Sequence, residues 1–299
     1  MKLSYNELSK LQYDKEFNYP MKKYTSLRVG GKADLIIYPN NSKELIGLLN
    51  LMRKKDIPWV VLGGGSNTIV YDRGIKGVVV STKKLRKIEF RNSGKILAEA
   101  GAVLGTILNK TINRGMSGFE FSAGIPGTVG GGIFMNAGAN CGEIKDVTER
   151  VWIWDGNKEV PIDRADINFE YRKSNLPENC VITKALFQLK ISSKEKVERK
   201  VKDYLDKRSK TQPIKYTNTG SIFKNPPQEP AGKLLEELGL KGFKIGGAKI
   251  SEIHANFIIN SGNASTNDIL ELIEFAKKQA LAKRGINLET EVRIIGENN

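Results

Sequence analysis

The chain has 299 residues, of which 39% are hydrophobic and 27% charged, as in ordinary globular proteins, and at ~150 residues per domain this length predicts about two folding units. No run approaches the ~18 consecutive apolar residues of a membrane span, and the charged N-terminus has no apolar signal core, so we expect a cytoplasmic protein without membrane insertion. Two cysteines and one histidine exclude a disulfide framework, a zinc finger and a His-rich metal site, so no metal is expected.

The formal net charge of +15 favours polyanionic partners, such as phosphorylated substrates, nucleic acid or acidic membrane surfaces. The lysines are spread along the chain rather than gathered in one tract, so solvated helix faces also account for them. A nucleic-acid-binding module would need aromatic residues interleaved with basic ones, and we find no such run. We therefore expect no nucleic-acid partner, although the net charge alone does not distinguish between these classes of polyanionic partner.

Helical periodicity alternates with short β-branched runs in the N-terminal part of the chain. Ser42 is predicted to cap a helix, KELIGLLNLMRKK, which Pro58 ends. Its apolar stripe consists of Leu45, Leu48, Leu49 and Met52. WVVLGGGSN then predicts a buried strand that runs into a glycine turn. Val78–Val80 and ILAEA predict further strands, and VLGTILNKTINRG predicts a helix closed by Gly115 at its C′ position. This alternation indicates an α+β chain.

Between Gly124 and Gly142 the chain is dense in glycine: GIPGTVGGGIFMNAGANCG contains seven. Glycine permits a positive φ and a close approach of the backbone to a ligand, at ~0.5–1 kcal/mol in regular structure. Five apolar residues of the segment are expected to be buried, namely Ile125, Val129, Ile133, Phe134 and Met135. The segment therefore predicts backbone amides around a phosphate rather than a loose surface loop.

The composition of the chain becomes strongly charged after Lys190, and this change predicts the boundary of a C-terminal domain. SSKEKVERKVKDYLDKRSK is typical of a charged connecting helix, packed through Val197, Val201 and Leu205. Beyond it we expect the helix AGKLLEELG, the strand HANFIIN and a last helix from about Asn267 to Arg284. The predicted division is 1–80 and 81–195 for two lobes of a nucleotide-binding module and 196–299 for a substrate-binding domain.

Neither common glycine-loop fingerprint fits LGGGSN. The Rossmann pattern G-x-G-x-x-G would place a glycine and the start of a helix at Thr68, whereas the following IVYDRG looks extended and then turns. No GK dipeptide is followed by Ser or Thr, so a P-loop is excluded as well. Two glycine loops, 63–67 and 124–132, remain as nests for a pyrophosphate. They predict a dinucleotide cofactor in a fold other than the Rossmann fold, without identifying it.

LGGGSN followed by SAGIPGTVGGGIFMNAGA resembles the FAD-binding module of the vanillyl-alcohol-oxidase type. With YRKSNL, GSIFKNP, AGKLLEELGLKGFKIGGAKISEIHANFIIN and LETEVRIIG, the chain is similar to the UDP-N-acetylenolpyruvoylglucosamine reductase family over roughly residues 20–296. The compact run from GSIFKNP to the last helix resembles the shorter class of that family, which lacks a tyrosine-loop insert. The implied fold is α+β: a two-lobed FAD-binding module followed by a smaller α/β substrate-binding domain.

The resemblance implies a reduction in two halves, in the synthesis of peptidoglycan precursors. NADPH, as co-substrate, gives a hydride to FAD, and the reduced flavin gives it to the vinyl carbon of UDP-N-acetylglucosamine enolpyruvate, which becomes UDP-N-acetylmuramate. We expect a monomer that acts on these two polyanions. An alternative is an oxygen-dependent flavin oxidase of the same fold; the nucleic-acid-binding protein considered above is a further alternative.

The resemblance also suggests three catalytic residues. Arg172, in YRKS, suits the enolate, because a guanidinium binds a carboxylate in a two-pronged fork. Ser221, in GSIFKNP, is the expected proton donor. Glu291 falls on the family's position for polarising the acid group or orienting the donor, although Glu289 lies on the same face.

The remaining expected site residues bind cofactor and substrate. FAD should be held without a covalent bond, because the sole histidine, His254, lies outside the glycine-loop domain and neither cysteine lies in the 63–67 loop. His254 itself is interpreted as a structural residue or a neighbour of the site. Expected to bind the substrate are Tyr171, Lys224 and Asn225. Expected to bind the cofactor are Gly63, Gly64, Gly65, Ser66, Asn67, Gly124, Ile125, Pro126, Gly127, Gly130, Gly131, Asn136, Ala137 and Gly138.

Overall fold

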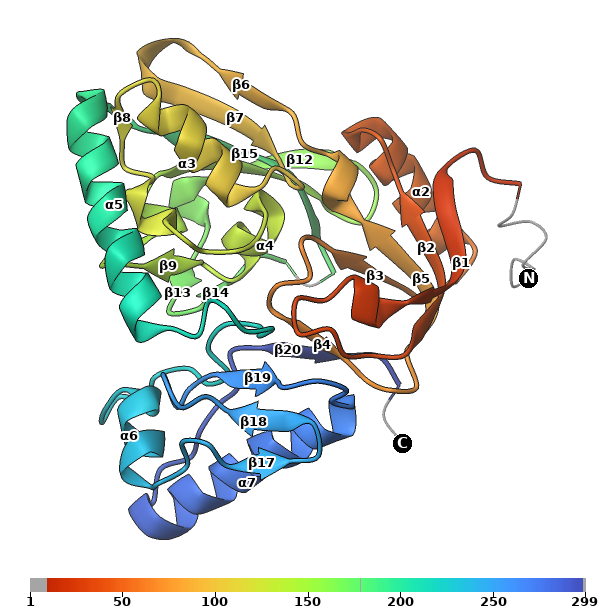
Figure 1. Ribbon diagram of the computed structural model, residues 1–299. Coiled ribbons are helices and arrows are strands. Elements are labelled where there is room, and N and C mark those ends of the chain that lie inside the picture. The colour runs from red at the N-terminus through yellow and green to blue at the C-terminus, as the bar shows by residue number, and fades with distance from the viewer. Residues whose placement is uncertain (1–9, 178, 298–299) are drawn as a thin grey trace. The chain divides into compact units, whose positions relative to one another are not determined.

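A computed structural model describes residues 10–177 and 179–297 (Figure 1). The chain divides into two compact units, each assembled from three segments. The first unit comprises Met1–Phe17, Leu35–Gly64 and Gly77–Asp206, and the second comprises Asn18–Asp34, Gly65–Lys76 and Lys207–Asn299. No helix in the described part of the chain is long and apolar enough to cross a bilayer.

A four-stranded sheet has the order β1 (Asp14–Pro20), β2 (Lys32–Tyr38), β5 (Ile75–Ser81) and β3 (Trp59–Leu62), with β3 parallel to β5. Its partner is α2 (Ser42–Lys54), whose predicted apolar stripe is buried against the valines of β5 and the apolar residues of β2. The predicted N-cap was wrong by one residue. Asn41 caps the helix by accepting the Glu44 amide at 2.9 Å, because the Glu44 side chain, three residues later, accepts in return from the Asn41 side-chain amide at 3.0 Å.

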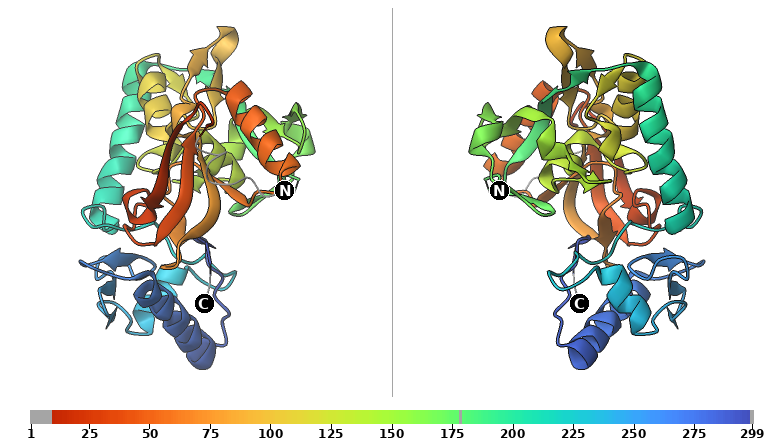
Figure 2. Two further views of the ribbon diagram at one scale, coloured as in Figure 1. Left: turned by 90° about the vertical axis from the view of Figure 1, so that its right-hand side faces the viewer. Right: turned by 90° about the vertical axis from the view of Figure 1, so that its left-hand side faces the viewer.

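The second sheet of the first unit is antiparallel throughout. Its strands follow the order β12 (Glu159–Asp163), β11 (Thr148–Trp154), β15 (Val181–Gln188), β7 (Lys95–Glu99) and β6 (Ile88–Phe90). Three helices share its apolar core: α3 (Leu104–Ile112), α4 (Val129–Phe134) and α5 (Lys194–Thr211). Both figures show α5 along one side of this unit, beside α3 (Figure 1, Figure 2).

Three details of these helices differ from expectation. Gly115 has φ +60 but lies beyond the C-cap, Asn113, so the helix α3 ends one residue earlier than predicted. Val197 and Val201 of α5 are buried, whereas Leu205 is exposed, because the packed stripe ends before it. Of the five residues expected to be buried, Val129 and Ile133 are buried and Ile125 and Met135 are partly buried. Phe134 is exposed, since it is the last residue of the short helix α4 and lies off its packed face.

The second unit contains the antiparallel sheet β17 (Lys244–Ile245), β18 (Ala248–Ile250) and β19 (Ile258–Asn260), with α6 (Ala231–Glu237) and α7 (Thr266–Arg284). The predicted last helix is present as α7; Ser265 begins it in a capping box, and Gly285 closes it in the left-handed conformation. The core of the unit also takes up Leu27, Val29 and Ile69 from the N-terminal part of the chain. Strand β20 (Arg293–Ile295) pairs in parallel with β4 (Thr68–Val70).

Short elements complete the fold. Two-stranded ribbons are formed by β8 (Met116–Ser117) with β16 (Lys190–Ile191), β9 (Gly138–Ala139) with β10 (Gly142–Glu143), and β13 (Phe169–Glu170) with β14 (Lys173–Ser174). The 3-10 helices are η1 (Met21–Lys23), η2 (Thr82–Lys84), η3 (Asn92–Gly94), η4 (Glu120–Ser122), η5 (Ile144–Asp146) and η6 (Arg164–Asp166). The ribbons β9–β10 and β13–β14 carry residues of the candidate site.

Candidate active site

The first glycine loop follows β3, as predicted, and leads into strand β4 instead of a helix. A side chain at each of two of its glycines would collide with a different neighbour. A Cβ at Gly63 would lie 2.4 Å from Thr128 Oγ1, and one at Gly65, which has φ +72, would lie 2.8 Å from the Tyr24 carbonyl oxygen. The loop ends in Asn67, whose side-chain amide donates to the Glu291 carbonyl at 3.1 Å. The fold itself therefore requires glycine at 63 and 65.

The second glycine segment forms α4 and the turns around it. Inside the helix, a Cβ at Gly130 would meet Ala100 Cβ at 3.1 Å, and one at Gly132 would meet Ile144 Cδ1 at 3.0 Å. A Cβ at Gly131 would have only Thr128 Oγ1 near it, at 3.8 Å, and this glycine is exposed. Glycine lowers helix stability by about 0.8–1.0 kcal/mol relative to alanine. Packing thus accounts for Gly130 and Gly132 but leaves Gly131 unexplained by any protein contact.

Thr128 carries a buried polar atom that lacks a partner. The residue is 3% exposed, and its Oγ1 has no hydrogen bond within the described residues. A buried hydroxyl without a partner is unfavourable by about 1–3 kcal/mol, so such groups in native proteins usually meet a ligand or an ordered water. Gly63 and Gly131 flank this oxygen. An unpartnered donor between two glycines fits a cofactor whose polar groups approach the backbone closely.

The YRKS motif lies at the tip of the β13–β14 hairpin, and the hairpin is fastened to the glycine segment. Ser174 Oγ donates to the Phe134 carbonyl at 2.9 Å, and Asn136 Nδ2 donates to the Glu170 carbonyl at 2.9 Å. These two hydrogen bonds, one from each strand of the hairpin, restrict the movement of the hairpin relative to α4. Tyr171 and Arg172 are the two residues between the strands, and the Tyr171 ring is 45% exposed with the Arg172 guanidinium 5.0 Å from its centroid.

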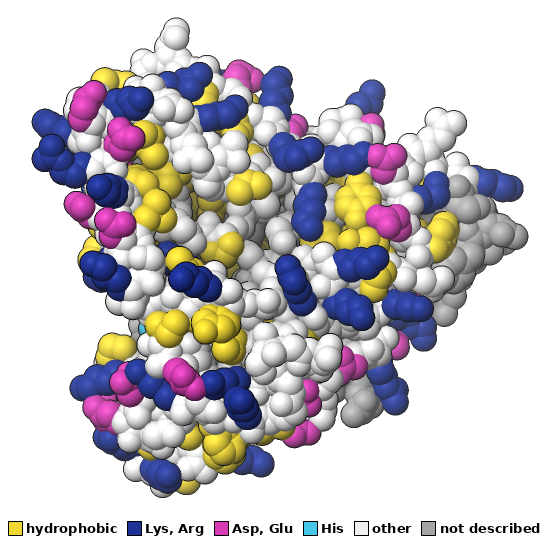
Figure 3. Space-filling view, viewed as in Figure 1, with side chains coloured by type: hydrophobic (Ala, Val, Ile, Leu, Met, Phe, Trp, Pro, Cys, Tyr) yellow, Lys and Arg dark blue, Asp and Glu magenta, His cyan; other side chains and the backbone are white. Residues whose placement is uncertain are grey.

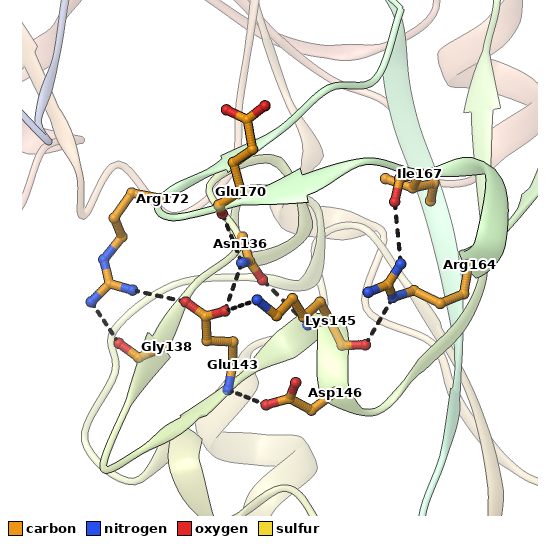
Figure 4. A network of polar contacts seen from close by, with 9 residues as sticks. All are labelled: Asn136, Gly138, Glu143, Lys145, Asp146, Arg164, Ile167, Glu170 and Arg172. Carbon is orange, nitrogen blue, oxygen red and sulfur yellow. Dashed lines mark hydrogen bonds and ion pairs between the residues drawn. The ribbon is translucent and has the colours of Figure 1, made fainter.

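Among the described residues, two acceptors face the Arg172 guanidinium (Figure 4). Its Nη2 donates to the Gly138 carbonyl at 2.9 Å, and its Nη1 lies 3.8 Å from Glu143 Oε1. The predicted cofactor residue Asn136 is fully buried, and its side chain also donates to Glu143 at 3.0 Å. Gly138 therefore contacts Arg172 directly, and Asn136 contacts it through Glu143. Both contacts are independent of the cofactor role predicted for these two residues.

In the second unit, backbone hydrogen bonds bring the Ser221 segment beside the Glu291 segment. The Glu291 amide donates to the Ile222 carbonyl at 2.8 Å, and the Lys224 amide donates to the Glu289 carbonyl at 2.9 Å. On the other side, the Ile222 amide donates to the Asn256 carbonyl at 2.9 Å. The Ser221 segment thus lies between the segments that contain Asn256 and Glu291, which fix its backbone.

Asn256 reinforces this arrangement. Its side chain makes a double hydrogen bond with Phe223: Oδ1 accepts the Phe223 amide at 2.9 Å, and Nδ2 donates to the Phe223 carbonyl at 2.8 Å. The residue is 3% exposed, and burial of an amide side chain is favourable only when it is hydrogen-bonded. A lone Asn between the apolar Ala255 and Phe257 was the available sequence signal for this role, and the sequence analysis missed it.

A cavity of about 300 Å³ opens beside these segments. Ser221, Asn225 and His254 are among its lining residues, together with Lys233 and Glu236. Burial lowers the pKa of the His254 imidazole below its ordinary 6.5, and the charge of Lys241 lowers it further, so the ring is neutral near pH 7. His254 Nδ1 accepts the Asn256 amide at 3.2 Å, which leaves the proton of the neutral ring on Nε2.

The candidate residues fall into two groups. Arg172 and Tyr171 belong to the first unit, with the 124–138 segment. Ser221, Lys224, Asn225 and Glu291 belong to the second unit, with Ser66 and Asn67. Glu143, Thr128 and Asn256 are neighbours that the sequence analysis did not assign to the site, whereas it interpreted His254 as a structural residue or a neighbour of the site. The division of the chain at 80 and 195 stays a prediction.

Comparison with known proteins bears on both units. Residues 33–160 match a family model described as an FAD binding domain, and residues 212–295 match the C-terminal domain of UDP-N-acetylenolpyruvoylglucosamine reductase. The chain is 44% identical over 282 residues to the protein of that name from Caldanaerobacter subterraneus, covering 94% of this chain and 93% of the relative. It is 44% identical over 285 residues to the one from Caldicellulosiruptor bescii, covering 94% and 90%.

A solved structure gives the same result. The crystal structure of UDP-N-acetylenolpyruvylglucosamine reductase from Thermus caldophilus matches with a TM-score of 0.81 and 34% identity. The match covers 95% of this chain and 98% of that one. The predicted fold class, an α+β chain with an FAD-binding module followed by a smaller domain, is confirmed.

Proposed function

Because the chain belongs to the UDP-N-acetylenolpyruvoylglucosamine reductase family, we propose that its chemistry is carried by Arg172, Ser221 and Glu291. The protein is an FAD-containing oxidoreductase that uses NADPH to reduce UDP-N-acetylglucosamine enolpyruvate to UDP-N-acetylmuramate in peptidoglycan precursor synthesis. Bound FAD supplies the hydride transfer between the two substrates. The side chains of the protein then have to bind the substrate, stabilise the charge that develops and deliver a proton.

Arg172 stabilises the carboxylate side of the substrate as it becomes enolate-like. The observation that supports this most is the attachment of its hairpin to the glycine segment, through Ser174 and Asn136. A permanently charged, planar donor on a fixed support lowers the energy of developing negative charge without having to reorganise. Tyr171, which is exposed at the same tip, contributes to substrate binding.

Ser221 delivers the proton to the carbon beside the one that accepts the hydride. The backbone of the next residue, Ile222, is hydrogen-bonded on both sides, so the hydroxyl lies on a fixed backbone next to a cavity. A serine hydroxyl is a weak acid, so nearby donors must stabilise the alkoxide that remains. Lys224 and Asn225 follow in the same segment and bind the substrate.

Glu291 is favoured over Glu289 as the third residue. The Glu289 side chain is 71% exposed and pairs with Lys224 Nζ at 3.1 Å. Glu291 is half-buried, and its amide and carbonyl are bonded to Ile222 and Asn67. Its backbone therefore shares one ladder with the Ser221 segment, which supports a role in polarising the acid group or orienting the proton donor.

The two glycine segments hold FAD without a covalent bond. The unpartnered Thr128 hydroxyl and the open position at Gly131 support this, and Thr128 joins the predicted cofactor residues of 63–67 and 124–138. The proposal predicts that acid precipitation releases all flavin into the supernatant. Flavin retained by the precipitate would overturn it.

We further propose that the enzyme acts as a monomer in the cytoplasm. Cys141 and Cys180 are both free thiols, as expected in a reducing compartment. Lys and Arg side chains are scattered among acidic ones over the face shown in Figure 3, which fits small polyanionic substrates better than a nucleic-acid platform. Light scattering of the purified protein measures its molar mass, and the mass of a dimer would contradict the proposal that the enzyme acts as a monomer.

The absorbance of the flavin tests the function. The purified protein should show the visible band of an oxidised flavin, NADPH should bleach it under nitrogen, and UDP-N-acetylglucosamine enolpyruvate should restore it. If oxygen restores the band and the enolpyruvyl ether does not, the oxidase alternative is correct instead.

A further inference from the structure

The backbone at Arg172 has a conformation that arginine rarely adopts. Arg172 has φ +55, in the left-handed region, at the second of the two residues that join β13 to β14. Glycine or asparagine usually occupies such a turn position, because a Cβ is unfavourable there. A side chain that is retained at a strained turn has a function that outweighs the strain, and its direction depends on what holds it.

Two acceptors of the β9–β10 ribbon hold this side chain. The Gly138 carbonyl and the Glu143 carboxylate face neighbouring nitrogens of the guanidinium, at 2.9 Å and 3.8 Å. The Arg172 side chain is 19% exposed, and that of Glu143 is 22% exposed. A hydrogen bond on one nitrogen and an ion pair on its neighbour together restrict the rotation of the guanidinium plane.

Glu143 is itself held in place from three directions (Figure 4). Asn136 Nδ2 donates to its Oε2 at 3.0 Å, and Lys145 Nζ lies 2.5 Å from the same oxygen. The Glu143 amide donates to the Asp146 carboxylate at 2.8 Å in a capping box around η5. The carboxylate oxygen that faces Arg172 is therefore placed by a rigid frame.

The charges of this cluster are unequally shared. Lys145 lies close to one carboxylate oxygen, whereas Arg172 lies 3.8 Å from the other, beyond hydrogen-bond distance. Lys145 is therefore the closer charged partner of Glu143. The longer distance to Arg172 makes Glu143 an orienting neighbour of the guanidinium rather than a tightly hydrogen-bonded one.

We propose that Glu143 is a positioning residue, which acts on the reaction only by aiming the Arg172 guanidinium at the substrate carboxylate. The inference rests on the proposed role of Arg172. It assigns to the ribbon β9–β10 a function in the substrate half of the cycle, distinct from flavin binding. Glu143 touches neither substrate nor cofactor in this assignment.

The test is a double-mutant cycle read by stopped-flow absorbance of the flavin. Glu143→Gln keeps the size of the side chain and removes its charge. It should slow reoxidation of the flavin by saturating UDP-N-acetylglucosamine enolpyruvate, by up to about 10²-fold for a misplaced catalytic group. Reduction by NADPH should stay within twofold of wild type. In an Arg172→Lys background, where the fork is already lost, the same change should have almost no further effect.

The control variant is Glu170→Gln, which removes a carboxylate from the β13–β14 hairpin that carries Arg172. The Glu170 side chain points away from the cluster in Figure 4 and is half exposed, so both half-reactions should be unchanged. Should Glu143→Gln fail to fold, Glu143→Asp keeps the charge, shortens the side chain by one methylene, and should show the same selective slowing.

The outcomes separate the inference from the function that it rests on. Selective slowing with a non-additive double mutant supports the positioning role. If Arg172→Lys impairs reoxidation but Glu143→Gln or Glu143→Asp does not, or if the losses add, Glu143 has no positioning role and the role of Arg172 stands. Equal slowing of both half-reactions would make Glu143 a general structural residue. If Arg172→Lys reoxidises normally, the role of Arg172 itself is wrong, and the inference falls with it.

Discussion

The two constellations of candidate residues are built in different ways. Arg172 lies in a turn, where its φ is positive. Its side chain is oriented by Glu143, which Asn136 in turn holds in place. Ser221 precedes a segment that backbone hydrogen bonds tie to residues 256 and 291. In the first region, neighbouring side chains define the geometry, whereas in the second the main chain defines it. Substitutions in the first region should therefore disturb position, and those in the second should remove a chemical group and little else.

The largest effect is expected at Ser221. Ser221→Ala should slow flavin reoxidation by substrate by ~10²–10⁴-fold, the usual contribution of a general acid, with the NADPH step near normal. Because the backbone defines this region, the melting temperature should hardly change. Ser221→Cys should recover part of the loss, since a thiol is more acidic. Stopped-flow absorbance measures both steps, and slowing of the NADPH step alone would assign Ser221 to NADPH binding instead.

Arg172→Lys comes next. It keeps the charge and loses the fork, so it should lower the rate of reoxidation by about 10²–10³-fold, as for other lost charge-stabilising donors. Flavin reduction by NADPH should be nearly unchanged. A lysine that works as well as arginine would show that charge rather than geometry matters here, and the contrast between the two regions would disappear.

A smaller effect is expected in the glycine segment. Gly131→Ala meets no close protein contact and improves helix propensity, so the apoprotein should gain up to about 1 kcal/mol in free energy of unfolding. The same Cβ should weaken FAD binding if the cofactor approaches this backbone. Chemical denaturation and flavin titration measure the two quantities. Gly47→Ala in α2, where a Cβ also meets nothing, is the matched control for stability and should leave FAD affinity unchanged.

The smallest effect concerns pH. Burial and the Lys241 charge lower the pKa of His254 in the folded protein, so the unfolded chain takes up the proton first as the pH falls. The stability that the neutral ring contributes is complete above pH 6.5 and is lost as the pH falls through the lower pKa of the folded state. Melting curves from pH 8 to 5 should decline more for wild type than for His254→Gln. The single imidazole NMR signal reports the pKa directly, and a value above 6.5 would reverse the expected sign.

Local patterns predicted much of the fold. The strand before LGGGSN, the extended run after it and the last helix, α7, depend on neighbours in sequence, and they are confirmed. The errors lie where two local choices are nearly equal. Asn41 and Ser42 are both good caps, and Glu44, three residues after Asn41, decides between them in the structure. Phe134 and Leu205 fit a helical stripe, but only tertiary packing determines where a stripe ends.

The site was less accessible to sequence reasoning. The positive φ of Arg172 contradicts the preference of arginine, so no propensity would predict it. Glu143 and Arg172 belong to two separate ribbons, β9–β10 and β13–β14, and only the tertiary structure brings their side chains to 3.8 Å. The orphaned hydroxyl of Thr128 is visible only once its surroundings are known. Motifs thus indicated which residues matter, while the contacts that direct them required the structure.

The pairing of β4 with β20 has a consequence for how the chain is made. A fragment confined to Lys207–Asn299 would lack Leu27, Val29 and Ile69 from its core, and β20 would have no partner, so it should be poorly folded in isolation. During translation, β4 leaves the ribosome long before residues 293–295 exist. Its apolar residues Ile69 and Val70, fully buried in the finished protein, must wait exposed or bound by a chaperone until the complementary strand arrives.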